Sequence, residues 1–452
     1  MHTTDRVFKL KSNPPNSQSE KKLVISRWTR NMPVIVLTSY LVFSIILFAF
    51  GPWPWDVVSP FKFYSYLSIY TIAFVGGYLS ASRSEPKKYS FPIDGLTLFK
   101  LGLLISGLLL PLNYVSRQQL GVSLMEGIVD PGDVYQTVQE ASKGLVSGQG
   151  SAIGYIVVYS QVFFGVLTAL VFPYFVVHWS KLSFPLRAAG FLSVVGSVAV
   201  GVFMTGATKV LADTLGLLPW FVWIALRKRS VRSISYPKLV GVGVIAIVAL
   251  FFVLNFFGRT VTGRSGRSEI GVTDQTVGIS ADRGNVFIRY FPETMKGPLT
   301  AMSHYITQGY YGMGLCLELP FVPCFGLGNS VFLMYYLDKV LGEGIMYERT
   351  YTGRAEIAFG EASGMGRWQS IYPWLASDVT FPGVAVVIFF IGRLMAKCWI
   401  DVMGGENPFA LSLFSFLLIS VLYFPANNQI VQNTSQCVPF YLTLLCWWKF
   451  RK

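Results

Sequence analysis

Long apolar runs separated by short polar segments dominate the sequence. A helix of about 20 apolar residues spans the hydrocarbon core of a bilayer, which is about 30 Å thick. Runs of about this length occupy residues 32–51, 62–81, 93–115, 152–179, 187–206, 209–226, 237–258, 380–400, 409–425 and 430–448. The pattern predicts an all-α protein, a polytopic transmembrane helical bundle of about ten or more helices.

The spacing of the runs divides the chain into four parts. In order they are a basic tail (1–31), N-terminal transmembrane helices (32–258), a large loop (259–379) and C-terminal transmembrane helices (380–448). A loop of this length is uncommon unless it has a function. Its apolar stretches at 298–319 and 330–341 predict short interfacial or re-entrant helices, because non-helical backbone persists at membrane depth only within protein or along a wet cavity.

Charge supports this organisation. Charged residues make up only 13% of the 452 residues, and the net charge is +14, whereas soluble domains carry about a quarter charged residues. The basic residues gather between the runs: Lys21, Lys22, Arg27, Arg30, Arg83, Lys87, Lys88, Lys181, Arg187, Arg227, Lys228, Arg229, Arg232, Arg393, Lys397, Lys449, Arg451 and Lys452. Alternation from a cytoplasmic N-terminus places every cluster on one side, as the positive-inside rule requires. We therefore expect the bilayer, not nucleic acid, as partner.

Sequence motifs for nucleotides and metals are missing. The chain has no P-loop, no zinc-protease helix motif, no His/Cys set at metal-ligand spacing and no Asp-x-Asp pair. We therefore expect neither a metal nor another cofactor. Cys316 and Cys324 share the large loop, where an oxidising compartment would pair them as a disulfide and burial would keep them as free thiols. The sequence leaves both interpretations open.

Several motifs in the last two-thirds of the chain have a familiar pattern. They are His304-Tyr-Ile-Thr-Gln-Gly-Tyr-Tyr-Gly-Met-Gly, Cys324-Phe-Gly-Leu-Gly-Asn-Ser330, the segment 366–383 and the turn Thr205-Gly-Ala-Thr-Lys-Val210. Together with the long late loop, they resemble the Wzy-type O-antigen polymerases, which polymerise oligosaccharide repeat units in bacteria. The O-antigen ligases, a related family, share this layout. The resemblance implies a multi-pass protein of the bacterial inner (cytoplasmic) membrane with the loop in the periplasm.

The same resemblance implies a metal-independent glycosyltransferase. A growing glycan leaves its undecaprenyl pyrophosphate carrier and joins the sugar of an incoming lipid-linked repeat unit. The partners implied are undecaprenyl-pyrophosphate-linked oligosaccharides, the lipid bilayer and a chain-length-regulating co-polymerase. Because negative charge grows on the departing pyrophosphate, fixed cations must stabilise it.

The candidate pyrophosphate-binding cations are Lys209, Arg283, Arg349, Arg354 and Arg367. A guanidinium group binds phosphate as a bidentate fork and stays protonated when desolvated. Lys209 is expected at a turn between two helices, at membrane level, where a cation is costly and usually functional. The alternative for Lys209 is a snorkelling lysine that anchors the helix end. For Arg354 and Arg367 the alternative is a salt bridge to Glu356 or Glu361.

The candidate catalytic residues are His304 and Glu361. Of the chain's three histidines, His304 alone falls in the large loop, and an imidazole exchanges a proton near neutral pH. A structural role is the alternative for His304, and Glu318 and Asp378 are competing bases. The candidate sugar-binding residues are Tyr305, Tyr310, Tyr311 and Trp368. For these the alternative is the aromatic belt that membrane proteins place at the interface.

Three rival functions compete with the polymerase. An O-antigen ligase would transfer the glycan to lipid A-core with similar chemistry. A flippase or transporter of lipid-linked sugars is expected to have repeated halves and short loops, whereas this chain has one long loop and no internal repeat. A non-catalytic membrane scaffold would not require the arginines of the large loop. The sequence therefore favours the polymerase, with the ligase as its nearest alternative.

Overall fold

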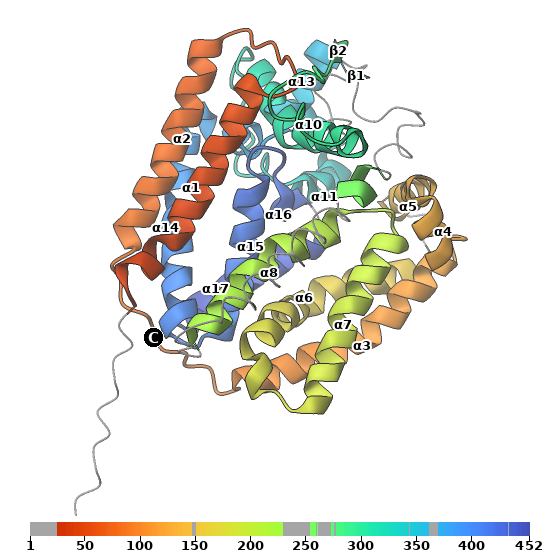
Figure 1. Ribbon diagram of the computed structural model, residues 1–452, viewed down its shortest axis with the longest axis vertical. Coiled ribbons are helices and arrows are strands. Elements are labelled where there is room, and N and C mark those ends of the chain that lie inside the picture. Colours follow the sequence, from red (N-terminus) through yellow and green to blue (C-terminus); the bar gives the residue numbers. More distant parts are fainter. Residues whose placement is uncertain are drawn as a thin grey trace, which may run out of the picture.

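The structure is a computed structural model, and it describes residues 25–146, 151–228, 254–258, 260, 273–274, 277–342, 344–360, 369–432 and 434–452. Helices dominate these parts of the chain (Figure 1). The helices are α1 (Arg27–Phe50), α2 (Pro60–Ala81), α3 (Gly95–Gln118), α4 (Leu124–Val129), α5 (Pro131–Val146), α6 (Ala152–His178), α7 (Phe184–Phe203), α8 (Lys209–Lys228), α10 (Glu293–Cys316), α11 (Val331–Leu341), α12 (Ile345–Arg349), α13 (Tyr351–Phe359), α14 (Ile371–Gly404), α15 (Pro408–Tyr423), α16 (Gln429–Gln432) and α17 (Thr434–Lys449). A 3₁₀ turn, η1 (Trp179–Lys181), follows α6, and the strands β1 (Thr273–Asp274) and β2 (Ile279–Ser280) pair antiparallel.

Six helices in the described parts of the chain are long and apolar enough to cross a membrane: α1, α3, α6, α7, α8 and α14. Each lies on a run predicted from the sequence, and α2, α15 and α17 occupy three further runs. α15 and α17 have 16 residues each, fewer than the usual spanning length. The predicted run at 237–258 lies outside the described residues except at 254–258. The chain is therefore an all-α, multi-pass membrane protein.

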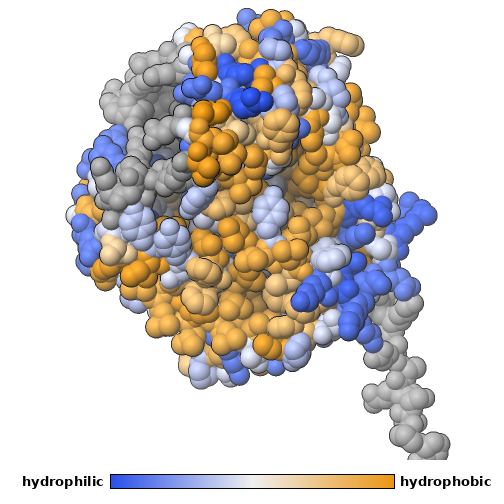
Figure 2. Space-filling view, turned by 180° about the vertical axis from the view of Figure 1, so that it is seen from behind, coloured by the Kyte–Doolittle hydropathy of each residue, from blue (hydrophilic) through white to orange (hydrophobic). Residues whose placement is uncertain are grey.

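The outer surface of the bundle is apolar. Figure 2 shows a broad hydrophobic area over the middle and lower part of one face, with hydrophilic regions at its top and lower right. Many large apolar side chains on the long helices are exposed, among them Phe43, Leu104, Leu108, Phe163 and Leu192. Soluble monomers rarely expose contiguous apolar patches of this kind. Lipid is therefore the solvent that suits this surface.

The helices α2 and α14 pack with their backbones in contact. A Cβ atom added to Gly77 would lie 1.9 Å from the carbonyl oxygen of Phe389. One added to Gly392 would lie 2.3 Å from the carbonyl oxygen of Phe74. Small residues allow this close approach in membrane helix pairs, where dispersion contacts stabilise association. The two helices therefore form one closely packed pair.

The segments that carry the basic clusters meet at one end of the bundle, at the bottom of Figure 1. Asp401, near the end of α14, is fully buried and accepts hydrogen bonds from the indole N–H of Trp447 and the backbone N–H of Lys87, both at 2.9 Å. Its carboxylate also pairs with Arg451. The contacts join the 82–92 segment, α14 and the C-terminal residues on the same side of the bundle.

The described residues between α8 and α14 lie at the other end, at the top of Figure 1. Within this segment, α10 (Glu293–Cys316) and α11 (Val331–Leu341) occupy the stretches 298–319 and 330–341 for which short helices were predicted. The short helices α12 and α13 and the hairpin β1–β2 complete the layer. The long loop is therefore largely helical in its described parts.

The helix α14 begins before the predicted run at 380–400. It starts at Ile371 and is kinked at Thr380, where a φ of 66° interrupts the helical backbone. Pro382 contributes to the kink, because proline cannot donate a backbone hydrogen bond to the preceding turn and disfavours helical geometry at the residue before it. The part of α14 before the kink carries Asp378 toward the large loop.

Candidate functional site

The helix α10 positions His304, the predicted general base. It begins at Glu293, directly after Pro292, and its C-terminal half is buried. At Gly309 the helix packs against backbone, since a Cβ atom there would lie 2.4 Å from the carbonyl oxygen of Pro425. The buried half of α10 is therefore held in the core. His304 lies in the less buried half, 23% exposed, and faces the connection between α1 and α2.

His304 pairs with Asp274 of the strand β1. The imidazole Nε2 lies 2.8 Å from Oδ2 of Asp274, whose side chain is only 6% exposed. The position of Asp274 is held by the hairpin, in which the N–H of Gly278 donates to the Asp274 carbonyl at 2.8 Å. A carboxylate at Nε2 favours the tautomer that is protonated there and leaves Nδ1 as the acceptor. The pair thus has the form of an oriented general base.

Aromatic side chains surround this imidazole. The ring of Trp53 lies 4.6 Å from the His304 ring, edge-on, and the ring of Trp55 lies at 5.4 Å. Trp55 also stacks on Tyr311 at 5.2 Å, and its indole N–H donates to the hydroxyl of Thr307 at 2.9 Å. Trp53 is buried, whereas Trp55 and Tyr311 are partly exposed. An accessible aromatic surface therefore adjoins the His–Asp pair.

The three predicted sugar-binding tyrosines of α10 differ in their surroundings. Tyr310 is fully buried, its hydroxyl is 2.9 Å from that of Ser44, and it packs in the aromatic core. Its expected contact with sugar is therefore wrong, because no ligand can reach a side chain closed off by the core. Tyr305 contacts Phe257 on another side of the helix. Of the three, Tyr311 is the one beside His304 and Trp55.

Arg349 and Arg354 lie together at the opposite end of α10 from His304. Arg349 donates to the carbonyl of Pro323 at 3.0 and 3.3 Å, and Arg354 donates to that of Pro320. Arg354 lies near Cys316 at the C-terminal end of α10, about 18 Å along the helix axis from His304 at 1.5 Å per residue. Both arginines thus hold the 320–323 segment, although Nη2 of Arg354 is buried without a hydrogen-bond partner.

Lys209, the first residue of α8, belongs to a polar network. Its ammonium group forms an ion pair with Asp213 one turn later and lies 5.9 Å from the ring centroid of Tyr423. With its amide oriented by its hydrogen bonds, Gln436 accepts from Lys209 at 2.9 Å. Lys209 is therefore paired within the protein, with residues of α8 and α17.

The remaining candidates are distributed over the segment. Arg283 is exposed, and the N–H of the preceding Asp282 donates to the carbonyl of Pro52 at 2.7 Å, next to Trp53. Glu318 is exposed at the end of α10. Glu361, Arg367 and Trp368 lie outside the described residues.

Asp378 has a structural role. Its carboxylate accepts from the backbone N–H groups of Gly326, Gly328 and Asn329 and from the side-chain amide of Asn329, at 2.9 to 3.0 Å. A carboxylate saturated by four donors has few lone pairs left for a substrate proton. The interpretation of Asp378 as a base is therefore disfavoured, and its function is to shape the 326–329 turn.

Two cysteines of this end are free thiols. Cys316 and Cys324 are both fully buried and unpaired. The sulfur of Cys316 instead donates to the carbonyl of Tyr351 at 3.6 Å. Of the two interpretations left open by the sequence, the structure has the buried free thiols.

Three residues of the His304 site were missed from the sequence: Asp274, Trp53 and Trp55. Both tryptophans lie in the short Gly51-Pro-Trp-Pro-Trp55 connection, and prolines in this order stiffen a connection. Two closely spaced tryptophans in a connection between predicted helices were a usable signal. Asp274 had none, because its pairing with a histidine 30 residues away depends on tertiary structure.

The comparisons with known proteins found no relative of this chain. No family model matches the chain, and neither curated proteins nor solved structures gave a match. The function is therefore argued from the site itself.

Proposed function

We propose that the chain is a glycosyltransferase that polymerises undecaprenyl-pyrophosphate-linked repeat units at the periplasmic face of a bacterial inner membrane. The observation that carries this proposal is the Asp274–His304 pair beside Trp55 and Tyr311. It lies at the end of the bundle away from the basic segments. An oriented base next to aromatic surfaces, at the end of a membrane bundle, suits transfer between two lipid-linked sugars.

In the proposed step, an acceptor hydroxyl attacks the anomeric carbon of the donor sugar while His304 takes the hydroxyl proton. The bond from that carbon to the pyrophosphate oxygen breaks, and undecaprenyl pyrophosphate leaves with the bonding electron pair. Asp274 orients the imidazole and balances the positive charge that it gains. His304 then releases its proton to water, which restores the base.

Binding of the sugars and of the leaving group would fall to different residues. Trp55 and Tyr311 offer ring faces for the apolar side of a pyranose. Arg283 follows Asp282, whose N–H donates to Pro52 next to Trp53, and Lys209 is a second candidate cation. The buried, unpaired Nη2 of Arg354 gives that arginine a donor for an anionic oxygen. Fixed cations of this kind stabilise a departing pyrophosphate.

The ligase remains the alternative within the same chemistry. An oriented histidine base and a pyrophosphate leaving group serve both reactions, which differ only in the acceptor. A lipid-linked sugar flippase is a less suitable alternative, because a transporter has no need of a carboxylate-oriented base.

Deletion of the gene in its host, followed by gel electrophoresis of lipopolysaccharide, separates these functions. Loss of a polymerase leaves a single repeat unit on the core. Loss of a ligase leaves none, with long polymer retained on the carrier lipid, and loss of a flippase leaves neither product. Either of the last two patterns would overturn the proposal. Restoration of long chains by the wild-type gene controls for secondary mutations.

A further inference from the structure

A pocket of about 470 Å³ lies at the ends of several membrane helices, apart from the His304 site. Its lining includes Arg117 in the last turn of α3, Thr205 after α7, Val210 at the start of α8 and Gln436 at the start of α17. A volume of this size is within the range of about 300–1,000 Å³ found for small-molecule sites. The pocket can therefore hold a polar group of appreciable size.

Arg117 gives this pocket a positive charge. No other charged residue lines it, and within the described parts of the chain the guanidinium makes no hydrogen bond or ion pair. The adjacent ion pair of Lys209 and Asp213, linked through Gln436, is neutral as a unit. A cation at membrane depth is costly and is normally paired. Among the residues that the structure describes, the pocket therefore has no anion that would balance Arg117.

The rest of the lining suits an amphipathic ligand. It offers amides, with Gln161 donating to Asn113 at 3.1 Å, and the hydroxyl of Ser435. Other lining residues are apolar, among them Phe416 and Pro439. A phosphate needs the first set of groups, and hydrocarbon needs the second. Free phosphate would use only half of the pocket.

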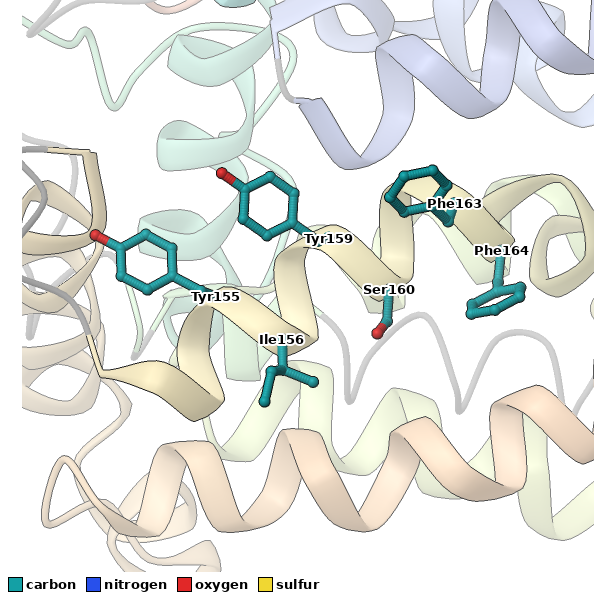
Figure 3. A pocket seen from close by; sticks show the side chains of 6 residues that line it. All are labelled: Tyr155, Ile156, Tyr159, Ser160, Phe163 and Phe164. Atoms are coloured by element: carbon teal, nitrogen blue, oxygen red, sulfur yellow. The ribbon is translucent and has the colours of Figure 1, made fainter.

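A shallow apolar groove lies on α6, on the face opposite to the residues that line the pocket. It has a volume of about 470 Å³ and is lined by Tyr155, Ile156, Tyr159, Ser160, Phe163 and Phe164. Figure 3 shows Tyr155 and Tyr159 on one side of the helix and Ile156 and Ser160 on the other. Phe163 is 76% exposed. The groove therefore faces away from the pocket, toward the surroundings of the bundle.

We propose that the Arg117 pocket binds the phosphate group of an anionic membrane lipid, whose tails lie against the apolar lining residues Phe416 and Pro439. Arg117 forms the ion pair with the phosphate, and the neighbouring amides and hydroxyls donate hydrogen bonds to its oxygens. The proposal requires insertion in a membrane but not the glycosyl transfer proposed above. Its failure and that of the enzymatic proposal are therefore independent.

Native mass spectrometry of the purified full chain tests the site. The lipids are phosphatidylglycerol and diacylglycerol, which differ in the phosphate-bearing headgroup. We expect one phosphatidylglycerol to be retained, with diacylglycerol bound at least about tenfold more weakly, as loss of a charge-assisted hydrogen bond implies. Arg117→Gln should weaken phosphatidylglycerol binding by a similar factor, and Arg117→Lys by less.

A matched control removes a charge elsewhere on the same helix. Lys100 is exposed on α3, so Lys100→Gln should leave lipid retention unchanged. Equal retention by wild type and Arg117→Gln, or equal loss in Lys100→Gln, would overturn the proposal. Displacement of the lipid by millimolar inorganic phosphate would overturn the assignment to a lipid, since the tails would then contribute nothing.

A second variant covers the case in which Arg117→Gln does not fold. Ser197 of α7 lines the same pocket, and Ser197→Leu fills it with an apolar side chain while leaving every charge in place. We expect phosphatidylglycerol retention to fall while the monodisperse elution of the protein is preserved. Unchanged retention in this variant would place the lipid elsewhere.

Discussion

Nε2 of His304 lies 2.8 Å from Oδ2 of Asp274, although the two residues are 30 positions apart and belong to a helix and to a two-residue strand. The carboxylate is nearly closed to solvent, and the imidazole is partly open. A buried carboxylate that binds one nitrogen of a partly exposed imidazole determines which ring nitrogen faces solvent. This arrangement is the one that a general base requires, and it is the reason for proposing His304 in that role.

Removal of either member of this pair should impair glycan polymerisation. We expect His304→Ala to lower activity by about a hundredfold or more, the usual contribution of a general base. Asp274→Asn should lower it less, since the imidazole remains but loses its orientation. Chain-length distributions on gels and initial rates with lipid-linked repeat units are the measurements.

The control for this pair is an acid on the same helix. Glu293 is 80% exposed and forms a surface pair with Lys296, so Glu293→Gln should retain wild-type activity. If His304→Ala, at normal expression, makes full-length polymer, His304 is not the base. Loss of expression instead of rate would indicate a structural pair.

The turn at 326–329 should depend on Asp378. Replacement by alanine leaves four N–H donors without their acceptor, and unsatisfied donors cost about 1–3 kcal/mol each where water cannot replace the partner. We expect Asp378→Ala to lower the unfolding temperature of the protein in detergent by several degrees. Glu318→Gln, at an exposed position, should not change it. An Asp378→Ala protein that is fully stable but inactive would restore the catalytic interpretation.

The sequence predicted the long helices well and the site only in part. The runs at 32–51, 93–115 and 152–179 coincide with α1, α3 and α6 within a few residues, because spanning a bilayer imposes both length and apolarity. The start of α14 could not be found this way, since residues 371–379 precede a kink and include Pro373, Ser377 and Asp378. These residues lower the local hydropathy enough to interrupt the predicted run.

For the candidate site, the sequence identified residue types with suitable chemistry, but it did not show which residues lie next to one another. The choice of His304 rested on its position in the large loop, and the structure gives it an acid and two tryptophans that its own motif does not contain. Tyr310 and Tyr311 are adjacent in sequence, yet one is in the core and the other beside Trp55. Successive helix positions point about 100° apart, so the facing direction depends on packing.

Contact between α2 and α14 should make Gly392 sensitive to substitution. Gly392→Ala would place a methyl group 2.3 Å from the carbonyl oxygen of Phe74. Backbone cannot yield as a flexible side chain does, so we expect a loss of about 1–3 kcal/mol in stability. Gly107→Ala, where nothing lies within 4 Å, is the matched control and should be neutral or slightly stabilising. Equal unfolding temperatures for the two variants would contradict the packing described.

Alkaline pH should weaken the fold through Cys324. Burial, together with the nearby carboxylate of Asp378, raises the pKa of this thiol from 9.0 to about 11. The folded state therefore holds the proton more tightly than the unfolded state, and its contribution to stability is present below pH 9 and is lost as the pH rises to about 11. Cys324→Ala should lose less stability across this interval, as followed by chemical denaturation.

The same thiol should react slowly with maleimide near neutral pH, because the thiolate is the nucleophile. Labelling should accelerate in denaturant. Rapid labelling of native protein at Cys324 would show that the thiol is exposed or its pKa is not raised.

The orientation of the bundle decides whether a periplasmic reaction is possible. In a cysteine-free background, Glu293→Cys places a thiol at the start of α10, and Arg83→Cys places one in the basic segment after α2; both positions are exposed. A membrane-impermeant maleimide should label Glu293→Cys in intact cells and Arg83→Cys only after the inner membrane is disrupted, because basic segments stay in the cytoplasm. The reverse pattern would put His304 in the cytoplasm, where it could not act on repeat units presented at the periplasmic face. The lipid site at Arg117 would survive that reversal, since its chemistry depends on the bilayer and not on the compartment beyond it.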